Sequence, residues 1–268
     1  KAGTESDPGS QFSDRTNAVR SDRTNMTSAT IGIGSLGTIG SRVAQAIVQD
    51  PNLGSLQAVS ARDHERAAQK LRDLGSDAKV VKMADLAMAD IVIECAPALI
   101  FREIAMPVIQ QGKTLIPASV AGLLANPDII ACAQETGARI IVPTGAIMGL
   151  DAVRAMAKGQ ISSAKITTRK APHSLAGAPY FDGRDFDPDA ITKPTTIFAG
   201  TTIEAAKAFP ANVNVAVALA LAGAGPSKTM VEIVADPEAK VNTHQIEVHG
   251  NVARLVMSID VLPSPENP

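Results

Sequence analysis

The stretch TIGIGSLGTIGSRVAQAI, from Thr30 to Ile47, constrains the fold of this chain more than any other. A short apolar run opens it, four glycines fall within the nine positions from Gly32 to Gly40, and apolar residues then recur at helical spacing. Strand, glycine-rich turn and helix, in this order, form the first unit of a parallel α/β sheet. The stretch therefore predicts such a sheet, provided that further strands and helices follow.

Strands and helices do alternate in the pattern of the first half of the chain. Apolar runs typical of strands lie at residues 55–61, 90–96, 113–119 and 138–145, and helical patterns lie at residues 64–75 and 126–137. The mainly apolar run DIVIECA, Asp90–Ala96, is typical of a strand buried on both faces. Strands separated by helices imply a parallel sheet with right-handed crossovers. Residues 29–146 are therefore predicted to form a doubly wound α/β domain of the Rossmann type.

The glycines permit two registers for a G-x-G-x-x-G loop. One runs from Gly32 to Gly37, and the other runs from Ser35 to Gly40, with a serine at the first position. A phosphate-binding loop must follow a strand and open a helix. The first register would place the strand in the polar segment NMTSATI, whereas the second uses the apolar ATIGIG and starts the helix near Thr38. We therefore favour the second register.

This register assigns a task to each residue of the loop. Gly37 lets the backbone approach a pyrophosphate, whose charge meets the free N–H groups at the helix start near Thr38. Ile39 packs beside the cofactor, and Gly40 allows the helix to approach the strand closely. A glycine-rich turn that binds no ligand is the alternative.

The end of the second predicted strand bears on the choice between NAD and NADP. Enzymes that use NAD tend to carry an acid there, roughly 20 residues beyond the glycines, for the ribose hydroxyls. This chain has Ala61, Arg62 and Asp63. Asp63 lies one or two positions beyond the usual place of this acid, and Arg62 is suited to a 2′-phosphate. The pattern predicts NAD or NADP and leans towards NADP; alternatively, Asp63 caps the next helix.

The second half follows a different rhythm, with several successive strands joined by short turns. Strands are predicted at residues 163–170, 195–200, 229–236, 243–250 and 253–261, and helices at residues 201–209 and 212–223. A long segment rich in Pro and Gly, residues 170–194, is of the kind that often covers a site. Residues 147–268 are therefore predicted to form a smaller α+β domain with a mostly antiparallel sheet.

Three polar residues of this half are candidates for a site. In the strand NTHQIEVHG, His244 shares the apolar face with Ile246 and Val248, where a histidine is either a core residue or a catalytic one. In FPANVNVAVALALAG, Asn212 is a plausible N-cap and Asn214 falls in the first turn of an apolar helix. Capping accounts for only one of the two asparagines, so the other is available to a ligand.

Composition excludes several classes of function. A net charge of −2, 3% aromatic residues and no Trp argue against a nucleic-acid surface. Two cysteines without a C-x-x-C motif and four scattered histidines argue against a metal site. No apolar run reaches the roughly 18 residues of a membrane span, and no signal-peptide pattern is present. We expect a cytoplasmic protein.

Residues 1–28 differ in composition from the rest. They are polar, lack apolar periodicity and contain the sequence SDRTN twice. We interpret them as a flexible arm outside both domains, with Met26 as a candidate natural start and a function of the arm's own left open.

Several motifs together resemble the L-aspartate dehydrogenases. They are the loop from Ser35 to Gly40, SVAGL (119–123), PTGAIMGLDA (143–152), TTRKAP (167–172), FPANVNVAVALALAG (209–223) and NTHQIEVHG (242–250). The resemblance runs from about Thr30 to the C-terminus. It implies a dinucleotide-binding Rossmann domain, a smaller substrate domain, a homodimer, and oxidation of aspartate to iminoaspartate and oxaloacetate.

The resemblance also implies roles for particular residues. The active-site histidine maps to His244, and contacts near the nicotinamide map to Ala146 and Asn214. We add Ala96 and Ser119, at the ends of two predicted strands, to the cofactor contacts. The chain departs from the family pattern at three positions: Ser35, Ala61 and Met148.

The implied chemistry suits a histidine. Hydride leaves the Cα of aspartate, and an imidazole takes the amine proton and activates the water that attacks the iminium. Burial would lower its pKa and keep it basic. Arg169 and Lys170 are both candidates for the substrate carboxylates, although each is equally consistent with a solvated strand end. The alternatives are a reductase of the dihydrodipicolinate or diaminopimelate type and a dinucleotide-binding sensor without turnover.

Overall fold

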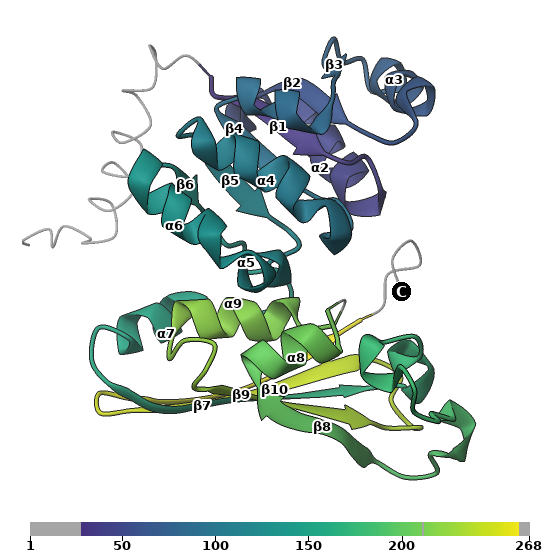
Figure 1. Cartoon of the computed structure of the whole chain (residues 1–268), viewed down its shortest axis with the longest axis vertical. Coiled ribbons are helices and arrows are strands. Elements are labelled where there is room, and N and C mark those ends of the chain that lie inside the picture. The colour runs from purple at the N-terminus through teal and green to yellow at the C-terminus, as the bar shows by residue number, and fades with distance from the viewer. Residues whose placement is uncertain (1–27, 211, 263–268) are drawn as a thin grey trace, which may run out of the picture.

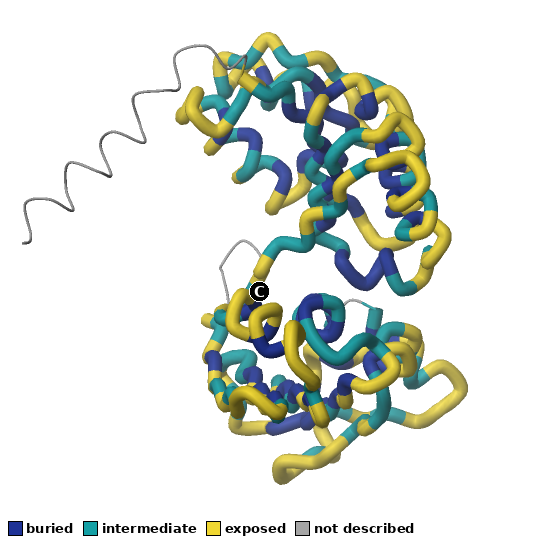
Figure 2. Tube along the Cα trace, turned by 90° about the vertical axis from the view of Figure 1, so that its left-hand side faces the viewer, coloured by how far each residue is buried: buried dark blue, intermediate teal, exposed yellow. Residues whose placement is uncertain are grey.

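Two β-sheets, one from each half of the chain, organise the computed structural model, which describes residues 28–210 and 212–262 (Figure 1). Buried segments run through the interior of both halves (Figure 2). The predicted arm, residues 1–28, lies outside the described residues except for its last residue. The last strand of the first sheet ends at Ile140 and the first strand of the second begins at Ile161, so the boundary at 146/147 stays a prediction.

The first sheet has six strands, all paired in parallel, in the order β3-β2-β1-β4-β5-β6. The strands are β1 (Thr30–Gly34), β2 (Ser55–Ser60), β3 (Lys79–Val80), β4 (Ile91–Glu94), β5 (Thr114–Pro117) and β6 (Arg139–Ile140). The strand order changes direction between β1 and β4, which is where doubly wound sheets bind ligands at their carboxyl edge. The predicted Rossmann-type sheet is confirmed.

Five α-helices accompany this sheet: α2 (Thr38–Gln49), α3 (His64–Asp73), α4 (Phe101–Gln110), α5 (Ala121–Ala125) and α6 (Pro127–Thr136). Helices α2 and α3 share one core cluster with the isoleucines of β1, while α4 and α6 belong to the other cluster. Helix α4 is not among the helices predicted from the sequence, since Pro107 interrupts its pattern; the structure accommodates this proline inside the helix. Strand β6 is shorter than predicted, and it ends before Pro143, which has no N–H to donate.

The alternation of isoleucine and glycine in β1 has a packing explanation. Ile31 and Ile33 are buried against α2 and α3. On the other face, a Cβ on Gly34 would lie 2.8 Å from the Cδ1 of Ile104 in α4, and one on Gly32 would lie 3.3 Å from the carbonyl oxygen of Leu86. Both glycines therefore serve the strand rather than the loop, which confirms the favoured register.

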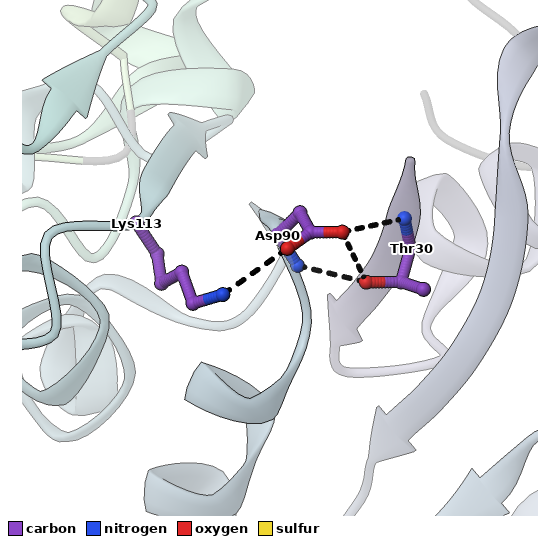
Figure 3. A network of polar contacts seen from close by, with 3 residues as sticks. All are labelled: Thr30, Asp90 and Lys113. Atoms are coloured by element: carbon purple, nitrogen blue, oxygen red, sulfur yellow. Dashed lines mark hydrogen bonds and ion pairs between the residues drawn. The ribbon is translucent and has the colours of Figure 1, made fainter. Parts of the chain in front are cut away.

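The amino ends of three neighbouring strands are joined by one polar cluster (Figure 3). The N–H and hydroxyl of Thr30 both donate to Oδ2 of Asp90, at 3.1 and 2.8 Å, and the N–H of Asp90 donates back to the hydroxyl at 3.0 Å. Lys113 Nζ lies 3.1 Å from Oδ1 of Asp90. These donors, those of Thr30 first, lower the pKa of the Asp90 carboxyl to about 2. The cluster fixes β1, β4 and β5 in register at the edge opposite the glycine-rich loop.

The second sheet has five strands in the order β11-β10-β7-β9-β8. They are β7 (Ile161–Lys170), β8 (Thr195–Thr201), β9 (Thr229–Ala235), β10 (Asn242–Gly250) and β11 (Arg254–Val261). Three of the four pairs are antiparallel, and β7 pairs with β9 in parallel, so the prediction of a mostly antiparallel sheet is confirmed. Helices α7 (Leu150–Met156), α8 (Thr202–Ala208) and α9 (Asn214–Ala222) lie over the face of this sheet that is turned towards the first half (Figure 1).

We predict that Gly40→Ala destabilises the fold and that Gly37→Ala does not. A Cβ on Gly40 would lie 1.9 Å from the carbonyl oxygen of Ser35, a backbone atom that cannot move without displacing the loop. We expect a loss of about 2–3 kcal/mol in the free energy of unfolding, measured by urea denaturation. At Gly37 the nearest atom lies 3.9 Å away and φ is −69°, so the change should stay within about 0.5 kcal/mol. Equal stability of the two variants would contradict this account.

Candidate functional site

The turn between β1 and α2 places the start of a helix beside the glycine-rich loop. Helix α2 begins at Thr38, Gly37 is its N-cap, and no side chain caps it. The first N–H groups of a helix have no partner within the helix, and the helix dipole adds positive potential there. A Cβ on Gly37 would have only one neighbour within 4 Å, the hydroxyl of Ser35, so a ligand can approach this backbone closely. The arrangement suits a phosphate group.

Ser35 occupies a backbone conformation that favours glycine. Its φ is 84°, in the left-handed region, and it is the one described residue other than glycine with a positive φ. Its N–H donates to the carbonyl oxygen of Ser60 at 2.9 Å, which ties the turn to the end of β2. This geometry explains why a glycine is usual at this position: the serine here adopts the same turn at a cost of order 1 kcal/mol.

A cavity of about 860 Å³ lies beside this turn, between α2 and α3. Three of the predicted cofactor residues, Gly37, Thr38 and Arg62, line it. Lys70 of α3 reaches across and donates to the carbonyl oxygen of Leu36 at 2.9 Å and to the hydroxyl of Ser41 at 3.0 Å. The cavity therefore extends from the turn after β1 to the end of β2, which is the span that the adenosine half of a dinucleotide requires.

Two more predicted cofactor residues, Ala96 and Ser119, are brought together by a buried carboxylate. Glu94, fully buried at the end of β4, accepts from the N–H of Ala96 at 2.7 Å and from the N–H of Ser119 at 3.0 Å. The hydroxyl of Ser119 donates to the carbonyl oxygen of Ala96 at 2.8 Å. Burial raises the pKa of Glu94 above its ordinary value, and the two N–H donors oppose this shift. Sequence reasoning missed Glu94, although a single acid inside an apolar strand was the available signal.

Asn214 links the two halves of the molecule. It is the first residue of α9, and its Oδ1 accepts from the N–H of Ala121, at the start of α5, at 3.1 Å. The amide nitrogen of Asn214 remains able to donate to a ligand. Ala146 is half-buried in a turn that the N–H of Ile147 closes by donating to the carbonyl oxygen of Thr144. Ile39, Ala96, Ser119, Ala146 and Asn214 are not among the described residues that line the cavity of 860 Å³.

His244 lies on the inner face of the second sheet. It is 5% exposed, and its Nδ1 is 3.0 Å from the hydroxyl of Thr168 on the neighbouring strand β7. Burial first, and then the positive charge of Lys170, lower the pKa of His244 to about 4. The imidazole is therefore neutral at physiological pH and able to accept a proton.

The structure separates the two basic residues that the sequence left equivalent. Arg169 forms an ion pair with Asp236, at 2.9 Å. Lys170, on the opposite face of β7, donates to Oδ1 of Asn212, and burial lowers the pKa of Lys170.

The expectation that Asn212 caps the helix is wrong: α9 begins after Val213 without a side-chain cap, and the Asn212 side chain instead accepts from Lys170. Asp63, by contrast, does cap α3, through the N–H of Arg66 at 3.0 Å.

Other classes of site find no support within the described residues. No group of three His, Cys, Asp or Glu side chains could hold a metal ion there. Burial, with a smaller contribution from Glu94, raises the pKa of the Cys95 thiol to about 12, so it is not a thiolate nucleophile. Over the same residues, every helix is too short or too polar to cross a membrane.

Two family models match the chain, one in each half. The NAD-binding domain of homoserine dehydrogenase matches residues 35–143, and the C-terminal domain of aspartate dehydrogenase matches residues 151–268.

Curated relatives and a solved structure extend this similarity to most of the chain. The L-aspartate dehydrogenase of Bradyrhizobium diazoefficiens is 45% identical over 256 residues, covering 95% of this chain and 91% of that protein. The L-aspartate dehydrogenase 3 of Bordetella bronchiseptica is 43% identical over 240 residues, covering 89% and 88%. The crystal structure of aspartate dehydrogenase from Thermotoga maritima aligns with a TM-score of 0.66 at 24% identity, over 86% of this chain and 88% of that one. At that identity it supports the fold alone.

We predict that Glu94→Gln loosens the segment that carries Ala96 and Ser119. Glutamine keeps the volume but offers one oxygen, so one of the two N–H donors would face an NH₂ group and lose its partner. An unsatisfied buried donor costs about 1–3 kcal/mol, which urea denaturation would measure. The dissociation constant of the reduced dinucleotide, from fluorescence titration, should rise in parallel.

Glu135→Gln, on the exposed surface of α6, is the matched control. It should change the free energy of unfolding by no more than about 0.5 kcal/mol. If Glu94→Gln behaves like this control in both measurements, Glu94 has no positioning role.

Proposed function

The chain belongs to the L-aspartate dehydrogenase family of NAD(P)-dependent oxidoreductases, and from this membership we propose a reaction and a set of roles. The reaction is the reversible oxidative deamination of L-aspartate, through iminoaspartate, to oxaloacetate and ammonia. The observation that carries the assignment of roles is the buried, neutral imidazole of His244, held by Thr168 beside the cation of Lys170. When bound, the nicotinamide supplies the acceptor for the hydride that leaves Cα of the substrate.

His244 acts as the general base and acid. Its Nδ1 is engaged with the Thr168 hydroxyl, so Nε2 is the nitrogen that faces the substrate. Nε2 takes a proton from the substrate amine, which frees the nitrogen lone pair to form the C=N bond as hydride departs. After releasing that proton to solvent, Nε2 takes a second proton from the water that attacks the iminium carbon and returns it to the nitrogen, which departs as ammonia. The carbonyl then forms as the new hydroxyl group loses its proton to the ammonia. A pKa of about 4 in the free protein keeps this nitrogen unprotonated until substrate binds.

Lys170 binds a carboxylate of the substrate. Lys170 is half-buried, and its charge adds to the effect of burial in lowering the pKa of His244. A half-buried cation whose hydrogen bond goes to a neutral amide, Asn212, can pair with an incoming anion. Arg169 is already paired with Asp236 on the other face of the sheet, which supports Lys170 over Arg169.

The remaining roles concern the cofactor. Gly37, Thr38 and Ile39 receive the pyrophosphate at the start of α2, and Arg62 lies at the adenosine end of the cavity. Ala96, Ser119 and Ala146, together with Asn214 of the second half, surround the nicotinamide. This is supported by the hydrogen bonds of Glu94, which hold Ala96 and Ser119 together, and by the bond between Asn214 and Ala121, which joins the two halves. The homodimer implied by the resemblance stays a prediction, for which sedimentation equilibrium is the measurement.

We predict that His244→Ala lowers kcat for aspartate by about 10²- to 10⁴-fold, the usual contribution of a general acid–base. Formation of reduced cofactor is followed by absorbance, in both directions, with oxaloacetate plus ammonia for the reverse. The dissociation constant of the cofactor should change little, because His244 is assigned to the substrate side. Unchanged turnover would refute the role, and turnover of a cyclic imine but not of aspartate or oxaloacetate would refute the substrate.

The low pKa of His244 predicts two pH dependences. The acidic limb of kcat/KM should have its midpoint near pH 4, in place of the 6.5 of an ordinary histidine. Because the folded pKa is depressed, the stability that the neutral imidazole contributes is complete above pH 6.5 and is lost as the pH falls towards 4. The loss is on the order of 3 kcal/mol and should be absent from urea unfolding of His244→Gln over the same range. Parallel stability curves for the two proteins would contradict the shift.

We predict that Lys170→Met raises KM for aspartate at least about tenfold while lowering kcat less, because a charge-assisted contact to the carboxylate is lost. The same change should move the acidic limb of kcat/KM to higher pH, since the charge that depresses the pKa of His244 is gone. Lys170→Arg, which keeps the charge, should restore the acidic limb and part of the affinity.

Lys165→Met, on the exposed face of the same strand, is the matched control and should leave KM and the pH profile unchanged. A rise in KM without any movement of the acidic limb would mean that Lys170 acts on the packing around the site and not through its charge.

A further inference from the structure

The cavity between α2 and α3 carries more positive than negative charge at the end of β2. Four cationic side chains line it, Arg42, Arg62, Arg66 and Lys70, against two acidic ones, Asp63 and Asp73. In a doubly wound domain the adenosine ribose lies in this place, beyond the carboxyl end of the second strand. The charges around the cavity therefore determine whether a ribose with a free 2′-hydroxyl or one with a 2′-phosphate is bound more tightly.

The acid that would bind a free 2′-hydroxyl is missing. Strand β2 ends at Ser60, which is 3% exposed and whose carbonyl oxygen accepts from Ser35, and Ala61 follows. The nearest carboxylate, Asp63, caps α3 by accepting from the N–H of Arg66. Asp73, at the far end of the same helix, accepts from the Gln69 side chain at 2.7 Å. Each acidic side chain of the cavity thus has a local donor.

The cations are placed differently. Neither Arg62 nor Arg66 forms an ion pair with another described residue, and both are exposed at the rim of the cavity. Arg66 and Lys70 lie one turn apart on α3, so they share a face. Lys70 is half-buried and anchored to the turn through Leu36 and Ser41, which keeps its charge at the inner end of the cavity.

We infer that this cavity is a 2′-phosphate site, so that the protein selects NADP(H) over NAD(H). Two guanidinium groups without acidic partners suit a phosphate dianion, which accepts paired N–H donors from arginine. No carboxylate at Ala61 is present to repel that charge, and the anchored ammonium of Lys70 adds to the attraction. The inference rests on the proposed placement of the dinucleotide at Gly37 and adds Arg66 and Lys70 to the residues that recognise it.

Binding of two nucleotide fragments tests the site without any catalysis. Isothermal titration calorimetry compares adenosine 2′,5′-bisphosphate with adenosine 5′-monophosphate on the full chain. The bisphosphate should bind at least about tenfold more tightly, which is the effect of one or two charge-assisted contacts. Equal affinities would overturn the inference and would leave aspartate oxidation, measured separately, unaffected as a proposal.

Variants then test whether the charges of the cavity, and not its shape, determine the affinity for NADPH relative to NADH. Arg62→Ala and Arg66→Ala should each weaken NADPH binding about tenfold or more while changing the dissociation constant of NADH by less than about threefold. Ala61→Asp should reverse the preference, by repelling the phosphate and accepting from the ribose hydroxyl. The control is Arg72→Ala, on the same helix and outside the cavity, whose guanidinium instead donates to Gln69. An equal loss of NADH and NADPH affinity in the arginine variants would show that they act on the adenosine alone, and would overturn the 2′-phosphate assignment.

Discussion

The contact between the α-carbon of Gly40 and the carbonyl of Ser35 sets the position of the glycine-rich turn. Helix α2 can begin where it does only because residue 40 has no side chain, and this close approach places the start of the helix beside Gly37. This turn also borders the cavity, and the carbonyl oxygen of Leu36 within it accepts a hydrogen bond from Lys70 of α3. The positive φ of Ser35 is the local cost of the same geometry, and the protein carries it without a glycine.

Two polar side chains order the carboxyl edge of the first sheet and its contact with the second half. Glu94 holds the ends of β4 and β5 together through two N–H donors, and Asn214 carries one further hydrogen bond across to the second half. Burial makes such bonds costly to break, so they fix the carboxyl edge of the first sheet relative to α9. The proposed cofactor contacts at Ala96 and Ser119 are thus held by Glu94, and the contact at Asn214 is held separately through Ala121.

Cationic side chains are arranged differently at the two ends of the proposed site. Near His244, burial first and then the charge of Lys170 keep the imidazole neutral, and the half-buried ammonium group of Lys170 leaves a positive site for a carboxylate. At the far end of the cofactor, exposed cations gather around the cavity and the acids there have local donors. Sequence reasoning located His244 because it interrupts an apolar alternation, but it could not weigh Arg169 against Lys170, since adjacent strand residues differ only in the face they occupy.

The sequence by itself determined most of the strands and helices, although not α4, together with the register of the glycine-rich turn and the face of β10 that carries His244. Hydrophobic periodicity and glycine spacing are local properties, so they can be read from the sequence. Only the tertiary structure decided what each polar side chain contacts. It turned Asn212 from a predicted cap into the partner of Lys170, and it made Glu94 the link between Ala96 and Ser119. It also brought the α3 side chain of Lys70 to the turn after β1. These contacts join residues distant in the chain, so no local pattern encodes them.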